Sequence, residues 1–170
     1  MVQTLLDNKA TVDDKDDRGL TALHFAAQNR HNEAVQLLLK HDAAIDATTN
    51  DGSTALLLAV ESFKNGELCA LTLVAAGADV DVARDNGETA CHVAVQSRDK
   101  GILPLLVAAG GDLDVPDHRG KTARQILADR RVQVDLSEDV LERYSCHIAK
   151  TRLDYVRNRA LQVCIGLQSR

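Results

Sequence analysis

The sequence predicts an all-α protein made of stacked helix-turn-helix units, and two observations lead to this expectation. The first is a short phrase, a glycine followed two residues later by Thr-Ala, that recurs four times, at Gly19, Gly52, Gly87 and Gly120. These glycines are separated by 33, 35 and 33 residues, a period typical of repeat proteins. The second is composition: aromatic residues make up only 2% and Trp is absent, so small and medium apolar side chains must fill thin layers between helices.

Each phrase predicts a turn followed by the start of a helix. Glycine adopts turn conformations that other residues reach only with strain. The threonine two positions later can accept a hydrogen bond from the first N–H groups of a helix. The apolar residues at 22–27 then suit a short helix and those at 34–39 a second one, with 29–32 joining them. Two short helices cannot bury their apolar faces alone, so we expect neighbouring units to stack, with short hairpin-like turns between helix pairs.

The whole unit resembles the ankyrin repeat. Residues 19–27 match that family's turn and first helix, residues 34–46 match its second helix and return loop, and residues 87–94 and 103–114 repeat the match. The family's usual proline before the first core leucine is replaced by alanine at 22, 55, 90 and 123, which costs little at a first helical turn. The resemblance implies an ankyrin-repeat solenoid over residues 1–131, divided into a partial repeat 1–15, repeats 16–48, 49–83 and 84–116, and a terminal repeat 117–131.

Residues 132–170 differ in pattern and are assigned to no family. Ser137 can cap a helix whose apolar residues continue at helical spacing, in one or two helices. We expect a C-terminal helical cap over the apolar flank of the last repeat, with a docking helix for a separate protein as the alternative. The chain begins inside a repeat and stops directly after an apolar stretch, which suggests a truncated segment of a longer protein.

Histidine and cysteine in this sequence favour structural roles. His24 and His92 each follow the helix-starting threonine by three residues, where the resemblance implies a histidine that bonds the turn and ties one repeat to the next. Leu57 occupies the same place in the middle repeat, so we expect that junction to lack the bond and to rely on packing. We expect ten residues to serve turns and helix caps: Gly19, Thr21, His24, Gly52, Thr54, Gly87, Thr89, His92, Gly120 and Thr122.

No motif predicts catalysis or a cofactor. The four cysteines are far apart with no Cys-x-x-Cys pair, and we expect buried, reduced thiols, which favours an intracellular setting, cytoplasmic or nuclear. Adjacent Cys–His pairs point about 100° apart on a helix and make no ready dyad. We find no metal signature, phosphate-binding glycine loop, nucleophile elbow, small-molecule site or membrane span, and therefore predict a non-enzyme with no cofactor.

Charge makes nucleic acid an improbable ligand for the repeats. Residues 1–118 contain nine Lys and Arg against nineteen Asp and Glu, whereas residues 119–170 contain eleven against six. Phosphate binding needs a positive face, and the repeats have the opposite sign. The basic tail carries no recognised nucleic-acid motif.

We therefore predict a protein-protein interaction scaffold that binds a partner protein through the concave face of the repeats. The resemblance points to residues beside each turn glycine and at the end of each first helix, and Leu20 is expected to be an exposed contact. The candidate partner-binding residues are Asp17, Arg18, Leu20, Gln28, Asn29, Asn50, Asp51, Ser53, Glu61, Ser62, Phe63, Asp85, Asn86, Glu88, Gln96 and Ser97. Phe63 lies in a loop two residues longer than its counterparts. The alternatives are an adaptor subunit whose C-terminal helices dock a second protein, such as a ubiquitin-ligase component, and a structural spacer in a larger protein.

Overall fold

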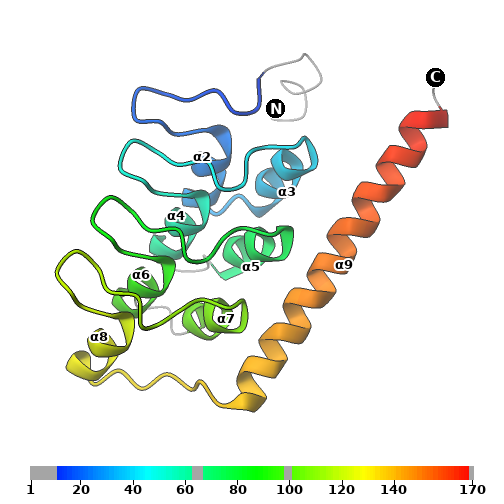
Figure 1. The fold of residues 1–170 in the computed structure, drawn as a ribbon. Helices are drawn as coiled ribbons and strands as arrows, with labels where there is room; N and C mark the ends of the chain where they lie inside the picture. Colours follow the sequence, from blue (N-terminus) through cyan, green and yellow to red (C-terminus); the bar gives the residue numbers. More distant parts are fainter. Residues whose placement is uncertain (1–10, 63–66, 98–100, 169–170) are drawn as a thin grey trace.

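The computed structural model describes residues 11–62, 67–97 and 101–168, and these ranges contain eight α-helices and no β-strand. The helices are α2 (Ala22–Gln28), α3 (Asn32–Lys40), α4 (Ala55–Glu61), α5 (Glu67–Ala76), α6 (Ala90–Gln96), α7 (Ile102–Ala108), α8 (Ala123–Arg130) and α9 (Glu138–Gln168). Figure 1 shows α2, α4, α6 and α8 in one row and α3, α5 and α7 in a second row beside it. The all-α helical solenoid predicted from the repeats is confirmed.

A threonine precedes each first helix. Thr21, Thr54, Thr89 and Thr122 all have extended backbone at the N-cap position, as a helix start requires. The Thr54 hydroxyl accepts a hydrogen bond from the Leu57 N–H at 3.3 Å. In the terminal repeat the Gln125 side chain accepts from the Thr122 N–H at 3.1 Å and completes a capping box.

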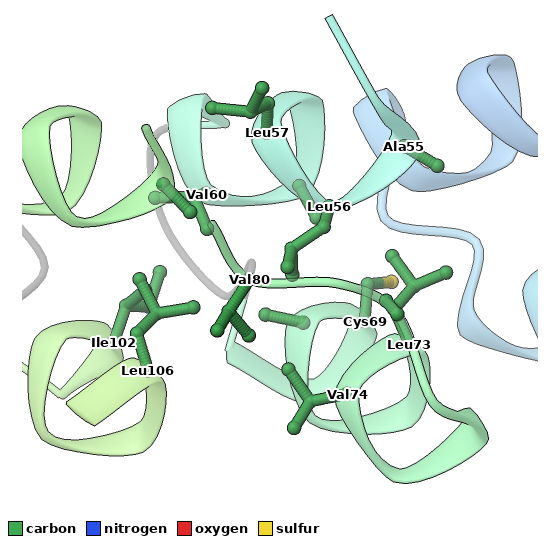
Figure 2. Close-up of a cluster of buried hydrophobic side chains, with 14 of the residues drawn as sticks. Ala55, Leu56, Leu57, Val60, Cys69, Leu73, Val74, Val80, Ile102 and Leu106 are labelled. Atoms are coloured by element: carbon green, nitrogen blue, oxygen red, sulfur yellow. The ribbon is translucent and has the colours of Figure 1, made fainter. Parts of the chain in front are cut away.

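The apolar core lies between the two rows of helices and continues from one repeat to the next. Figure 2 shows Leu56 of α4, Leu73 of α5 and Ile102 and Leu106 of α7 gathered around one interior, and each is at most 1% exposed. No helix pair encloses this cluster alone. Stacking therefore supplies most of the burial, as in other solenoids.

The turn glycines bring consecutive repeats into close contact. Gly19, Gly52 and Gly87 have φ of 78°, 77° and 81°, a region that side chains disfavour. A Cβ atom on each would lie within 2.7 to 2.9 Å of the next repeat's backbone nitrogen. Gly120 has φ of 73°, but a Cβ atom there would meet nothing within 4 Å, because no further turn follows it in the stack.

The C-terminal segment forms one helix, and its position differs from the expected one. Helix α9 lies along α7 and α5, on the outer side of the second row, and then diverges from α3 (Figure 1). It covers α7, as a cap of the last full repeat would, but it continues over α5 instead of ending at the flank. The two-helix alternative is wrong, because the backbone stays helical from Glu138 to Gln168.

Candidate functional site

The turn tips form a continuous edge because each tip donates a backbone hydrogen bond to the tip before it. The three bonds run from Asn50 N–H to Arg18 C=O (2.9 Å), from Asp85 N–H to Asp51 C=O (3.1 Å) and from His118 N–H to Asn86 C=O (3.0 Å). We call the exposed side of these tips together with α2, α4, α6 and α8 the tip surface. Its spacing is set by backbone bonds, so the side chains at the tips can vary without disturbing the stack.

A second ladder links the return loops, and the sequence analysis did not identify it. The carboxylates of Asp13, Asp46 and Asp81 accept hydrogen bonds from the N–H groups of Ala44, Asp79 and Asp112, at 2.9, 3.0 and 3.0 Å. The available signal was an apolar residue followed by Asp at 12–13, 45–46, 80–81 and 113–114. Some of the many aspartates in the repeats therefore serve to hold neighbouring return loops together.

The last member of this ladder has a different partner. Asp114 has no following return loop, and its carboxylate instead accepts bonds from Arg124 Nε at 2.7 Å and Arg124 Nη2 at 3.0 Å. This bidentate bond to the guanidinium lowers the pKa of the Asp114 carboxyl and raises the pKa of Arg124. Arg124, which occupies the place of Leu23, Leu56 and Cys91 in the earlier repeats, thus neutralises an aspartate at the end of the stack.

The two histidines lie between adjacent repeats. Nδ1 of His24 accepts from the Thr21 N–H at 3.1 Å, and Nε2 lies 3.2 Å from the carbonyl oxygen of Ser53 in the next repeat. A carbonyl only accepts, so the neutral ring with its proton on Nε2 satisfies both bonds. Burial is the main cause that lowers the pKa of His24. His92 bonds Thr89 N–H at 3.2 Å and the Lys121 carbonyl at 3.1 Å in the same way.

The middle junction lacks the histidine bond, as expected, but it has a different polar bridge and therefore does not rely on packing alone. Leu57 is buried and forms no such bond, but Arg84 of the next repeat reaches back across the junction. Its Nε donates to the Ser53 hydroxyl at 2.8 Å, and its Nη2 lies 2.5 Å from a carboxylate oxygen of Glu61. The Arg84 side chain is only 13% exposed but that of Glu61 is 53% exposed, so water reaches the carboxylate end of this ion pair.

Most predicted contact residues lie on the tip surface, at three levels of exposure. Ten are exposed: Asp17, Arg18, Gln28, Asn29, Asn50, Asp51, Glu61, Asp85, Asn86 and Gln96. Ser62, Glu88 and Ser97 are half-buried, and Phe63 lies outside the described residues. Several bond one another: Glu88 accepts from Gln96 Nε2 at 3.0 Å and from Asn86 Nδ2 at 2.9 Å.

Two predicted contact residues are buried, which corrects the expectation for them. Leu20 is 7% exposed, and its N–H donates to the Asp16 carboxylate at 2.8 Å. That bond is the main cause that lowers the pKa of Asp16. Ser53 is 0% exposed, and its hydroxyl donates to Asp51 Oδ2 at 3.0 Å. Neither side chain is available to a partner, because both are buried.

The cysteines divide into two kinds. Cys69 and Cys91 are buried, as expected, and desolvation raises the pKa of the Cys91 thiol to about 12. Cys91 is therefore an inert core residue. Cys146 on α9 is exposed, so the expectation of burial is wrong there. The side chain of Cys164 lies outside the described part of the structure.

A cavity of about 680 Å³ lies on the outer side of the molecule, where α5, α7 and α9 meet. Its lining consists of Asn29, Arg30, Glu67, Leu68, Leu71, Leu105, Tyr144 and His147. Asn29 thus lies at this cavity as well as at the end of α2. Over residues 11–62, 67–97 and 101–168, no group of three His, Cys, Asp or Glu side chains has the arrangement of a metal site. None of the described helices is long and apolar enough to span a membrane.

Stacked helix pairs joined by backbone bonds between turn tips define a helical-repeat solenoid, a class of protein that presents an extended surface. The family model for ankyrin repeats (3 copies) matches residues 1–83, and no curated protein matches the chain. The match identifies residues 1–83 as ankyrin repeats, which are protein-protein interaction modules. Beyond residue 83, α6, α7 and α8 continue the same turn and helix geometry.

Proposed function

We propose that this protein is a non-catalytic scaffold that binds a basic segment of a partner protein along its tip surface. The observation that carries the proposal is the rigid edge of turn tips, on which Asp17, Asp51 and Asp85 are all exposed. Backbone bonds fix the spacing of these carboxylates before a partner arrives, so little ordering entropy is lost on binding.

The chemistry of the partner follows from those acidic side chains that do not hold the return loops together. Asp13, Asp46, Asp81 and Asp114 are engaged in the return-loop ladder, away from the tips. Asp17 and Asp85, by contrast, are exposed at the tips. A lysine- or arginine-rich segment complements such an edge, and the complementarity favours both specificity and a fast association rate.

Selection from a random peptide library displayed on phage, with the full chain as bait, tests this function. We expect the selected peptides to carry an excess of Lys and Arg. The double variant Asp17→Lys with Asp85→Lys should lose their binding by at least about tenfold, equivalent to ~1.4 kcal/mol. Glu33→Lys with Asp139→Lys changes the net charge equally on exposed sites away from the tips and is the matched control.

Two outcomes contradict the proposal. One is a selected peptide set without basic excess. The other is equal loss of binding in the tip variant and in the control, which would show that overall charge, and not the tip edge, attracts the peptide. The spacer alternative predicts that no peptide is enriched over the phage background.

A further inference from the structure

Helix α9 has one face covered by the repeats. Tyr144 and Ile148 are half-buried and pack against the apolar core, and the Tyr144 hydroxyl donates to Glu67 Oε1 of α5 at 3.1 Å. Leu153 lies nine residues after Tyr144, about two and a half helical turns, and therefore on the opposite side of α9. It is 70% exposed, and Val156, three residues further, is 56% exposed.

The exposed side carries a regular apolar stripe. Cys146, Ala149, Leu153 and Val156 are all exposed and are separated by three, four and three residues. This alternation is the heptad spacing of a coiled-coil seam. In the sequence the spacing continues to Ala160, Val163 and Leu167, and the α9 backbone is helical to Gln168. We call the four described positions, Cys146, Ala149, Leu153 and Val156, the outer stripe.

Basic residues occupy both edges of the outer stripe. Lys150 directly follows Ala149 and Arg152 directly precedes Leu153, and both are exposed. The sequence adds Arg157 and Arg159 at the next positions of the two edges. No acidic residue stands at any of these edge positions from 150 to 159.

This charge pattern selects among the possible occupants of the stripe. A second copy of the chain would place basic edges against basic edges in both parallel and antiparallel pairing, which is repulsive. A membrane surface favours a wide apolar face of bulky side chains. The outer stripe is instead narrow, and a narrow apolar stripe at heptad spacing is the form of a coiled-coil seam.

We propose that the outer stripe of α9 pairs with a helix of another protein that has an apolar heptad seam and acidic edges, forming a two-stranded coiled coil. The repeats hold α9 through its inner face, so the outer stripe is presented without further rearrangement. This site is separate from the tip surface, and either can exist without the other.

Two synthetic helical peptides test the pairing with the full chain. Both have four heptads with leucine and isoleucine at the seam, but one has Glu and the other Lys at the edge positions. Because the acidic tips are themselves proposed to bind basic segments, the comparison uses the full chain with Asp17→Lys and Asp85→Lys. In this background, fluorescence anisotropy should show that the Glu peptide binds at least tenfold more tightly than the Lys peptide. Leu153→Asn with Val156→Asn should abolish the binding. Phe25→Asn, which removes an exposed apolar side chain on α2, should leave it unchanged.

A charge reversal provides the sharpest readout. Lys150→Glu with Arg152→Glu changes only exposed residues and should transfer the preference from the Glu peptide to the Lys peptide. Equal binding of both peptides, or an unchanged preference after the reversal, would overturn the proposal. It would also be overturned by dimerisation of the unmodified chain in sedimentation, or by tighter binding to phosphatidylserine vesicles than to the Glu peptide.

Discussion

The hydroxyl of Tyr144 donates a hydrogen bond to the carboxylate of Glu67 across 3.1 Å, although 77 residues separate them in the chain. This bond fastens α9 to the beginning of α5, and Ile148 packs against the core one helical turn further on. Helix α9 is thus held by a polar contact at one point and by apolar burial beside it. Neither contact was predictable from the spacing of apolar residues in the tail, because that spacing is compatible with more than one orientation of the helix against the repeats.

We expect α9 to contribute measurably to the stability of the repeats. Tyr144→Phe should lower the free energy of unfolding by about 0.5–1.5 kcal/mol, the net value of one hydrogen bond. Ile148→Ala should lower it by up to ~2 kcal/mol, since the half-buried side chain forfeits only part of a full core contact. Urea titration followed by circular dichroism measures both. An unchanged midpoint for Ile148→Ala would show that α9 does not stabilise the repeats.

The turn glycines offer a matched pair of substitutions. Gly120→Ala should cost about 1–2 kcal/mol, the strain of an alanine in the left-handed region. Gly87→Ala should cost clearly more, because the added Cβ would also lie 2.7 Å from the His118 backbone nitrogen and displace the next turn. Thermal unfolding of both variants measures the difference. Equal decreases in the unfolding temperature of the two variants would mean that the contact between Gly87 and the next turn can be lost without a cost in stability.

Acid should weaken the junction at His24. Because the pKa of His24 is lowered in the folded chain, the unfolded state binds more protons as pH falls through the ordinary range of histidine. The contribution of neutral His24 to the free energy of unfolding is therefore fully present above the pKa that His24 has in the unfolded chain. It is lost as pH falls toward the lower pKa that His24 has in the folded chain. Urea midpoints measured between pH 7.5 and 5 should decrease with falling pH.

The variant His24→Gln isolates this contribution. Glutamine already performs the capping part of the role at Gln125, where its side chain accepts from the Thr122 N–H. The variant should be less stable at pH 7.5, since the bond to Ser53 is lost, but its stability should change less with pH. A pH dependence identical to that of the unmodified protein would assign the acid effect to other groups.

Thiol labelling should separate the cysteines. Cys146 is exposed and should react with a maleimide reagent in the native protein, whereas Cys91, with its pKa raised to about 12, should react only after unfolding. Mass spectrometry of digested samples identifies the modified residue. Cys146→Ser removes the fast reaction and serves as the control. Modification of Cys91 in native buffer at the rate of Cys146 would contradict its assignment to the core.

The sequence alone determined the repeat architecture, because its signals are local. A glycine that must adopt positive φ, a threonine that caps a helix and a histidine three residues later lie within one turn, so their spacing indicates the structure directly. Because these signals are local, the resemblance to ankyrin repeats can also be recognised after residue 83, where the match to the family model ends. The domain division at residue 131 stays a prediction; in the structure α8 ends at Arg130, and Arg131 adopts a left-handed conformation.

Only the tertiary structure decided which side chains face solvent at the tips and where the tail lies. Leu20 and Ser53 stand beside exposed residues in the sequence, yet both are buried. The sequence pattern places Arg84 in a loop, but in the structure its side chain bridges to Ser53 and Glu61 across the junction that lacks a histidine. Helix α9 has two apolar faces, and its own spacing does not indicate which one the repeats bury. These outcomes depend on contacts between residues distant in the chain, and such contacts form only when the repeats stack.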